Sequence, residues 1–381
     1  MQTYQCTCGN RLFFDNTACL VCSSEVGWCE PCGRVTALKP LTAAEGAPIS
    51  YQCGYSDCQQ LLRKCHNYTV ENVCNRCTAA PPEGAPVVDA ADAVPSNPLC
   101  IACRSTETIP DLSIAGNREK WVRLEAAKRR LLYTLDCLGL PYENATPKLS
   151  FDFKANVEHP ADEWRNMGPA EIVYTGHADG KITINIQEAD DAAREHLRVQ
   201  FHEAHRTLVG HFHHEVGHYY WDVLVKGRNE PAFIKLFGDH NNPPYADAMS
   251  AYYQNGPREG WGLSFISPYA SAHPWEDFAE TFALYLDLVS VLDTASHLFK
   301  SMRVNLRSRS VTTLVERYQE MGLLVNEFNR TVGLLDLVPE IIIAPVVEKL
   351  EHIHSLVKRA AKSPRVKEAP IPPLISQPVM I

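Results

Sequence analysis

The sequence predicts an α+β protein in which a cysteine-rich zinc-ribbon domain precedes a mostly helical domain with a small β-sheet. Three observations support this fold class. Thirteen of the fourteen cysteines lie before residue 104, strand-like alternation is concentrated between residues 149 and 186, and helical spacing dominates the rest of the chain. We therefore expect a zinc-ribbon domain over residues 1–104, a second domain over 105–362 and a Pro-rich tail over 363–381.

The composition is that of an ordinary soluble globular protein with room for two or three domains. Of the 381 residues, 45% are hydrophobic and 21% are charged. The formal net charge of −9 argues against nucleic acid as a general partner, because phosphate binding requires a basic surface. No apolar run is long enough to predict a membrane span, and MQTYQCTCGN lacks the layout of a signal peptide. These features predict a cytoplasmic protein with no membrane partner.

The spacing of the cysteines predicts zinc binding rather than disulfides. Most cysteines come in close pairs, and glycine follows several of them, which suits the tight turns that deliver thiolates to one tetrahedral ion. The alternative is a set of buried free thiols, but this region is too poor in Leu, Ile and Phe to bury a large core without metal. Three structural sites are expected: the first from Cys6, Cys8, Cys19 and Cys22, the second from Cys29, Cys32, Cys53 and Cys58, and the third including Cys100 and Cys103.

The remaining ligands of the third site can be chosen in more than one way. The pair Cys65 and Cys74 is favoured, Cys74 with Cys77 is the runner-up, and His66 is a further candidate. Residues 79–98 are rich in Pro, Ala and acid, and we expect a flexible excursion there between the two halves of the site. The whole cysteine-rich region carries more acidic than basic residues, so a structural or protein-binding role is favoured over nucleic-acid binding.

Helix and strand patterns follow one another along the second domain. Apolar residues at helical spacing predict a helix over 117–138, which Gly139 and Pro141 end. LSFDF at 149–153 is strand-like, and EIVYTGHADGKITINI at 171–186 predicts a β-hairpin. Further helices are expected at 190–201, 205–225, 245–255, 274–299, 310–330 and 344–361.

A metal-binding pattern lies in HFHHEVGHYYWDVL, residues 211–224. His214 and His218 are four residues apart, so on a helix they share one face and can bind the same ion. Glu215 projects beside them toward a water molecule on that ion. Such spacing also occurs by chance in helices, so the interpretation requires a third ligand from the rest of the chain.

The neighbouring histidines are interpreted differently. HEAH at 202–205 resembles the metal-binding pattern, but its three-residue spacing predicts a helix surface or a turn. His211 and His213 are expected to be structural rather than ligands. The third ligand must therefore come from elsewhere in the chain.

A catalytic zinc site takes three protein ligands and leaves one position for water. The segment SPYASAHPWEDFAETFALYL, residues 267–286, offers Glu276 and Glu280, which share a face of the predicted helix. One of them can bind the metal while the other hydrogen-bonds a ligand histidine. The alternative is a pair of solvated glutamates, which the surrounding apolar residues disfavour: Phe278, Ala279, Phe282 and Leu286.

The pairing of HEVGH with EDFAE resembles the gluzincin metallopeptidases, in which a glutamate on a later helix is the third zinc ligand. The sequence of these two motifs is similar to that of the catalytic domain of anthrax lethal factor. This resemblance implies that Glu276 is the third ligand and that Tyr269, seven residues earlier, supports catalysis. Glu280 is then left to orient a ligand histidine.

A broader resemblance covers the chain up to about residue 300. The order of zinc ribbons followed by HEVGH is similar to a bacterial family of zinc-binding metallopeptidases with an N-terminal zinc-ribbon domain. IPDLS, LEAAKRRLLYTL and HPWEDFAETFALYL carry the likeness. It implies a zincin-like fold for the second domain.

These expectations combine into the hypothesis of a zinc-dependent peptidase. One catalytic zinc ion, held by His214, His218 and Glu276, and about three structural ions are expected. Glu215 is the expected general base, and Tyr269 the donor to the developing oxyanion. By analogy with related peptidases, the KITINI strand would offer a sheet edge to an extended peptide or protein substrate.

Three alternatives remain open at the level of sequence. The first is a non-catalytic zinc-binding module that interacts with other proteins, and it predicts metal without turnover. The second is a hydrolase of a non-protein amide, because the same zinc-water chemistry serves any amide. The third is a zinc-ribbon regulator, which predicts salt-dependent nucleic-acid binding despite the acidic balance.

Overall fold

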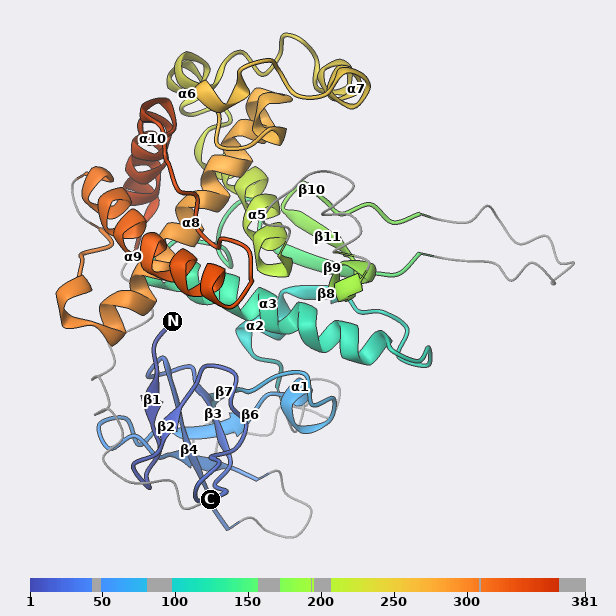
Figure 1. Ribbon diagram of the computed structural model, residues 1–381. Coiled ribbons are helices and arrows are strands. Elements are labelled where there is room, and N and C mark those ends of the chain that lie inside the picture. The colour runs from blue at the N-terminus through green and yellow to red at the C-terminus, as the bar shows by residue number, and fades with distance from the viewer. Residues whose placement is uncertain are drawn as a thin grey trace, which may run out of the picture. The chain divides into compact units, whose positions relative to one another are not determined.

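The computed structural model describes residues 1–42, 49–80, 98–156, 172–192, 194, 207–307 and 310–362 (Figure 1). The chain divides into two compact units. Among the described residues, the first comprises Met1–Arg104 with Asp293–Arg303, and the second comprises Ser105–Leu292 with residues 304–362. The fold class is α+β, as the sequence predicts: a cysteine-rich N-terminal region is followed by a largely helical unit with a small sheet.

Short strands build the cysteine-rich unit. Strands β1 (Tyr4–Gln5) and β2 (Arg11–Leu12) form an antiparallel pair. A closed barrel follows, made of β3 (Val26–Cys29), β4 (Arg34–Pro40), β5 (Tyr51–Cys53), β6 (Leu61–Lys64) and β7 (Arg76–Ala79). The parallel pairing of β3 with β7 closes the barrel. Two single-turn helices, α1 (His66–Thr69) and α2 (Ile101–Arg104), complete the unit.

A small aromatic core lies against the barrel. The ring of Trp28 is 6.0 Å from that of Tyr4 and 5.4 Å from that of Phe14. Gly27 allows β3 and β7 to approach closely, because a Cβ atom there would lie 2.9 Å from the carbonyl oxygen of Asn75. The sequence analysis does not anticipate this barrel, since its strands are short and cysteines interrupt their alternation.

The second unit contains a four-stranded sheet in the order β10–β11–β9–β8. Its strands are β8 (Thr106–Thr108), β9 (Ser150–Lys154), β10 (Gly176–Ala178) and β11 (Lys181–Asn185). β10 and β11 form the predicted antiparallel hairpin, and β9 runs parallel to both β11 and β8. The prediction that KITINI offers a sheet edge is wrong, because β11 is paired on both sides. The edge strands of this sheet are β10 and β8.

Helices make up the rest of the second unit. They are α3 (Asn117–Leu138), α5 (Leu208–Leu224), α6 (Glu230–Phe237), α7 (Tyr245–Asn255), α8 (Pro274–Leu298), α9 (Thr312–Thr331) and α10 (Ala344–Ala360). Short 3-10 turns occur in this unit at Ile186–Ala189, Trp261–Leu263 and Tyr269–Ser271, and in the first unit at Lys300–Met302. The α3 helix ends where predicted, because Gly139 adopts a left-handed conformation with φ 71°.

The α5 helix packs onto the sheet through its aromatic residues. The ring of Phe212 lies 5.8 Å from that of Phe151 and 6.2 Å from that of Phe153. On a different part of the helix, the ring of Tyr220 stacks on that of Phe282 of α8 at 5.2 Å. These contacts fix α5 between the sheet and α8.

The α5 and α8 helices cross at very short range because position 217 is glycine. A Cβ atom on Gly217 would lie 2.8 Å from the Cα atom of Ala279 and 2.9 Å from its carbonyl oxygen. The buried ion pair between Asp277 and Lys349, 2.7 Å long, joins the start of α8 to α10. The histidine motif on α5 and the glutamates on α8 therefore face each other.

Some sequence expectations fall outside the described residues. They are most of the 79–98 excursion, most of the 190–201 helix, the HEAH segment at 202–205 and the tail at 363–381. Among the residues that the structure describes, no helix is both long and apolar enough to span a bilayer.

Candidate metal centre

Three side chains from two helices point their ligand atoms at a common position. His214 and His218 come from α5, where Thr207 caps the N-terminus by accepting a hydrogen bond from the Gly210 N–H. Glu276 comes from the first turn of α8. The Nε2 atoms of the two histidines are 3.2 Å apart, and Glu276 Oε2 lies 3.2 Å and 3.3 Å from them.

This triangle has the dimensions of a tetrahedral zinc site. An ion about 2.0–2.1 Å from each of its donors separates those donors by roughly 3.3 Å. Glu276 is buried, and its Oε2 atom has no hydrogen-bond partner other than the two imidazoles within the described part of the chain. A carboxylate oxygen in that position needs a cation, and two neutral imidazoles and a carboxylate are a donor set that zinc prefers.

Glu280 lies behind His214. Its Oε1 atom is 2.7 Å from His214 Nδ1, and the Ser267 hydroxyl donates a 2.7 Å hydrogen bond to its Oε2 atom. Burial alone would raise the pKa of Glu280, but the contacts with His214 and Ser267 lower it below its usual range. Glu280 is therefore an ionised acceptor, which directs the Nε2 lone pair of His214 toward the centre of the triangle.

The carboxylates of Glu276 and Glu280 change the pKa of His214. Burial opposes its positive charge, but Glu276 and Glu280 raise the pKa of His214 well above its usual range. A metal ion binding at Nε2 takes the place of that proton. Metal binding at this triangle is thus coupled to proton release.

Tyr245 is a residue of the site that the sequence analysis missed. It begins α7, and its hydroxyl donates a 2.7 Å hydrogen bond to Glu276 Oε1. This contact fixes the rotation of the carboxylate and leaves Oε2 facing the two histidines. No pattern in the sequence links Tyr245 to Glu276, because the two residues are on different helices and 31 positions apart.

Glu215 and Tyr269 both lie close to the triangle. Glu215 directly follows His214 on α5, is buried, and has an Oε2 atom without a hydrogen-bond partner among the described residues. The ring of Tyr269 is 5.9 Å from that of His214. Burial, followed by the charge of Glu276, raises the pKa of Tyr269 above its usual range, so its hydroxyl remains a donor.

The two neighbouring histidines on α5 do not join the triangle. His213 Nδ1 lies 2.8 Å from Asp287 Oδ1, and His211 Nδ1 lies 3.1 Å from Glu188 Oε2. Both side chains have partners that explain their positions without a metal. Their structural interpretation from the sequence fits this geometry.

Twelve cysteines form three further candidate metal sites in the first unit. The groups are Cys6, Cys8, Cys19 and Cys22; Cys29, Cys32, Cys53 and Cys58; and Cys65, Cys74, Cys100 and Cys103. The shortest sulfur–sulfur distances within them are between 3.7 and 3.9 Å. A disulfide requires about 2.05 Å, whereas four thiolates about 2.3 Å from a zinc ion are separated by roughly 3.8 Å.

The surroundings of the sulfur atoms also favour thiolates. Backbone N–H groups of Arg76 and Cys100 each donate a 3.3 Å hydrogen bond to a cluster sulfur, and Asn10 Nδ2 donates one of 3.5 Å to Cys19. Neighbouring thiols and burial act in the opposite direction: they raise the pKa of Cys29 above its usual range, which disfavours its thiolate unless a positive charge compensates. Four thiolates can therefore gather only around a cation.

The third cluster bears on which residues accompany Cys100 and Cys103, a choice that the sequence left open. Its sulfur atoms are those of the favoured pair, Cys65 and Cys74, with Cys100 and Cys103. Cys77 lies apart from this group, buried on β7 where that strand approaches Gly27. His66, on α1, is also outside the group.

The two units together define a class of zinc-binding proteins. The first has cysteine clusters, and the second has a triangle of two histidines and a glutamate. Comparison with known proteins shows which family of this class the chain belongs to. The chain belongs to the family described as "Putative zinc-binding metallo-peptidase", whose model matches residues 117–356, and a zinc-ribbon domain model matches residues 3–114. The resemblance to zinc-binding metallopeptidases with an N-terminal zinc-ribbon domain is thereby confirmed.

Three curated proteins are similar to this chain over nearly its whole length. Uncharacterized proteins of Mycobacterium bovis and of two strains of Mycobacterium tuberculosis are each 34% identical over 375 residues. The alignment covers 95% of this chain and 96% of each relative. No solved structure matches the chain significantly.

Proposed function

We propose that this protein is a zinc-dependent peptidase of the gluzincin type. The observation that carries the proposal is the triangle of His214 Nε2, His218 Nε2 and Glu276 Oε2, with sides of 3.2–3.3 Å. The family match supports peptidase chemistry. Zinc, when bound, supplies a Lewis acid that polarises a water molecule and the scissile carbonyl.

The protein side chains have separate roles in the proposed reaction. Glu215 takes the proton of the attacking water and later gives it to the leaving amine. The Tyr269 hydroxyl donates a hydrogen bond to the oxyanion that develops on the scissile carbonyl. Glu280 holds the ring of His214 in position.

The substrate is proposed to bind as an extra strand on β10. In the described residues β10 pairs only with β11, so its outer edge has backbone groups available to an extended peptide. The ring of His177 on β10 lies 6.1 Å from that of Tyr219 on α5. A peptide on this edge would therefore run beside the helix that carries the histidine motif.

We assign the three cysteine clusters to structural zinc ions. Four thiolates close a tetrahedral site and leave no position for water, so these ions stabilise the fold and take no part in catalysis. The first unit has only a small aromatic core, which gives the metal a large share of its stability. With the catalytic ion, the protein would hold four zinc ions.

The Glu215→Gln substitution tests the proposed general base. The variant should retain the catalytic zinc ion, because Glu215 is not a ligand, but should lose cleavage of a peptide library at least 1000-fold. Mass-spectrometric detection of new peptide termini, with zinc content measured on the same sample, gives both readouts. Glu348→Gln on the exposed face of α10 is a matched control and should cleave as the wild type does. Full cleavage by Glu215→Gln would exclude this general base.

A further inference from the structure

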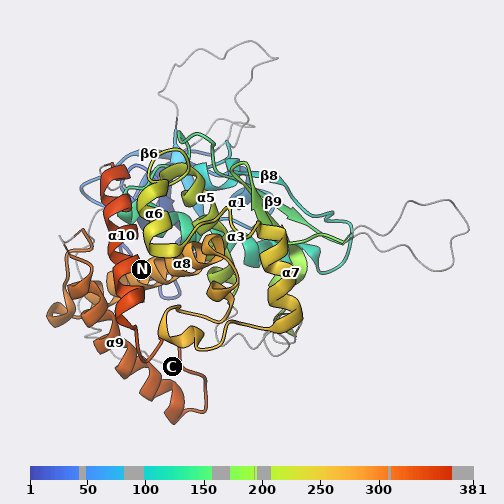
Figure 2. The ribbon, with the colours of Figure 1, turned by 90° about the horizontal axis from the view of Figure 1, so that it is seen from above.

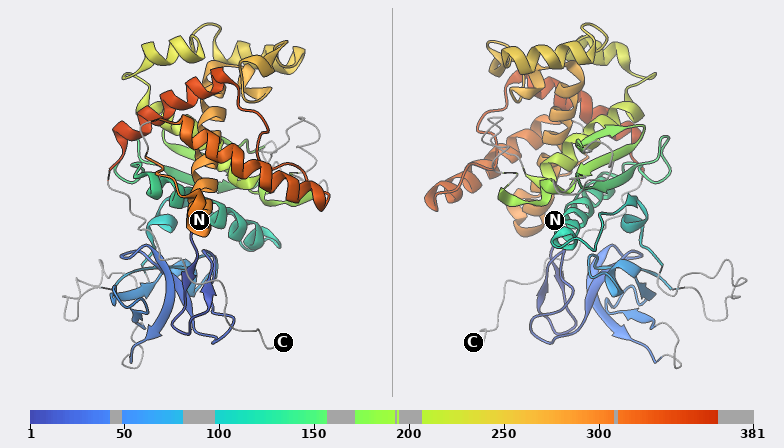
Figure 3. Two further views of the ribbon diagram at one scale, coloured as in Figure 1. Left: turned by 60° about the vertical axis from the view of Figure 1, so that its left-hand side comes forward. Right: turned by 90° about the vertical axis from the view of Figure 1, so that its right-hand side faces the viewer.

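Large apolar side chains gather on the last turns of α9 and on the segment that returns from them. We call residues 323–341 the apolar hairpin. Eight of its residues have exposed fractions between 46% (Leu324) and 72% (Ile341). They are Leu323, Leu324, Phe328, Val332, Leu334, Leu335, Leu337 and Ile341. Within the second unit, the end of α9 lies at the margin of the ribbon in Figure 2 and in both views of Figure 3.

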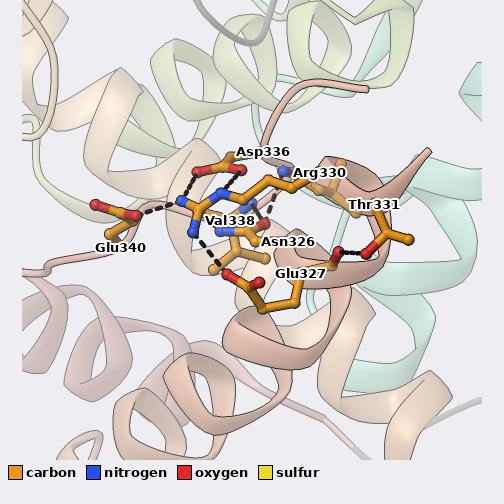
Figure 4. Close-up of polar contacts among 8 residues, drawn as sticks. Asn326, Glu327, Arg330, Thr331, Asp336, Val338 and Glu340 are labelled. Carbon is orange, nitrogen blue, oxygen red and sulfur yellow. Dashed lines mark hydrogen bonds and ion pairs between the residues drawn. The ribbon is translucent and has the colours of Figure 1, made fainter. Parts of the chain in front are cut away.

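A network of ion pairs holds the hairpin together (Figure 4). The Arg330 guanidinium pairs with Glu327 at 2.8 Å, with both carboxylate oxygens of Asp336, and with Glu340. Two of these carboxylates belong to the returning segment, so Arg330 ties that segment to α9. Single exposed ion pairs contribute little to stability, but a bidentate pair within a network fixes geometry.

Asn326 adds buried hydrogen bonds to this network. Its Nδ2 atom donates to the Val338 carbonyl at 2.8 Å, and its Oδ1 atom accepts from the Leu337 and Val338 N–H groups at 2.9 and 3.1 Å. Val338 is itself buried against Gly322, where an added Cβ atom would clash with its methyl group. The returning segment is therefore anchored, and the exposed apolar side chains belong to an ordered structure.

The exposed area of the hairpin's large apolar residues adds up to a considerable surface. At these exposed fractions the eight residues together expose on the order of 800 Å². A standard protein–protein interface buries about 800 Å² on each partner. The hairpin alone thus has the apolar surface that one side of a stable interface requires.

We propose that the apolar hairpin is a homodimer interface, in which it packs against the same hairpin of a second copy of this chain. A two-fold axis beside the hairpin lets the apolar hairpin of one copy cover that of the other, so one contact removes both hairpins from water. The ion pairs around Arg330 then form the polar rim that such interfaces have around an apolar centre. This inference does not depend on the proposed peptidase activity.

Sedimentation of the full-length protein at micromolar concentration tests the proposal. The wild type should sediment as a dimer. The double variant Phe328→Asp/Leu335→Asp places two charges on the patch and should raise the dimer dissociation constant at least 100-fold. Both positions are more than half exposed in the single chain, so the variant should keep the fold and the circular dichroism spectrum of the wild type. It should lose only the stability that dimerisation adds to the wild type.

A matched substitution controls for the added charge. Ile114 is 54% exposed in the turn before α3 and lies outside the hairpin, so Ile114→Asp should leave the dimer intact. A photoreactive residue at position 328 should crosslink one chain to another. A wild type that is monomeric at every concentration would overturn the proposal, as would a double variant that still dimerises. If the protein dimerises only after deletion of residues 363–381, that segment and not a second copy occupies the hairpin in the full-length chain, and the proposal is wrong.

Discussion

At the scale of single residues, the ligands of the candidate zinc site are positioned by their own hydrogen-bond partners. Ser267 holds Glu280, which holds His214, and Tyr245 holds Glu276. A ligand that is already oriented loses less conformational freedom when metal binds, and such partners typically change metal affinity by about 10–100-fold.

Tyr245 and Tyr269 should differ in what their hydroxyl groups do. Tyr245→Phe removes the donor to Glu276 and should weaken zinc binding about 10-fold, as measured by competition with a chelator. Tyr269→Phe should leave zinc affinity unchanged and lower kcat, because its proposed partner exists only in the transition state. Equal effects of the two substitutions on zinc affinity would contradict these separate roles.

His177 should make stability depend on pH. Burial lowers the pKa of His177 to about 4, and its Nε2 atom accepts a hydrogen bond from the Gly180 N–H. Between pH 6.5 and 4 the unfolded chain therefore binds the proton and the folded chain does not, so stability falls as pH falls through this window. Urea unfolding at pH 7 and pH 5 should show a smaller loss for His177→Gln than for the wild type. Equal losses in the two proteins would exclude this contribution.

The candidate ligands were predictable from the sequence, and their supporting residues were only partly so. Spacing of four residues places His214 with His218, and Glu276 with Glu280, on common helix faces. Tyr245 could not be predicted, because its contact depends on where α7 lies relative to α8. Helical spacing identifies residues that share a face within one helix, and it contains no information about which helices meet.

At the scale of secondary-structure elements, the crossing of α5 and α8 determines whether the site can form. Gly217→Ala would place a methyl group 2.8 Å from the Ala279 Cα atom. The gain in helix propensity, about 1 kcal/mol, is outweighed by an overpacking cost of about 1–3 kcal/mol. We expect a lower melting temperature and weaker zinc binding.

A second glycine provides the control for this prediction. Gly262 has no atom within 4 Å of an added Cβ and no positive φ, so Gly262→Ala should leave stability and zinc affinity nearly unchanged. A Gly217→Ala protein as stable as the wild type would show that the helices can separate without cost. The site would then depend less on the crossing than we infer.

Elements with strong local signals were predicted well, and those defined by distant pairing were not. The bounds of α3 and α7 match the prediction, because Gly139 ends α3 and Pro244 precedes α7. The short helix α6 was missed, since eight residues show little periodicity. The order of strands in the sheet and the closure of the barrel depend on residues far apart in the chain, so KITINI was wrongly placed at an edge.

At the scale of the whole molecule, the two units should respond differently to the removal of zinc. We propose that the first unit is stabilised by zinc at its cysteine clusters, whereas the second buries the aromatic contacts of α5 and α8. A strong chelator should unfold residues 1–104 and leave most helical signal in place, as hydrogen exchange and circular dichroism can measure. Protected amides in β3–β7 after complete zinc removal would show that the barrel is stable on its own.

The central claim is that one zinc ion is bound jointly by two histidines of α5 and a glutamate of α8. An anomalous-diffraction map of crystals, recorded at the zinc absorption edge, tests it most directly. We predict a peak about 2.0–2.1 Å from His214 Nε2, His218 Nε2 and Glu276 Oε2. Zinc peaks at the cysteine clusters, with none between α5 and α8 in zinc-saturated crystals, would contradict the claim.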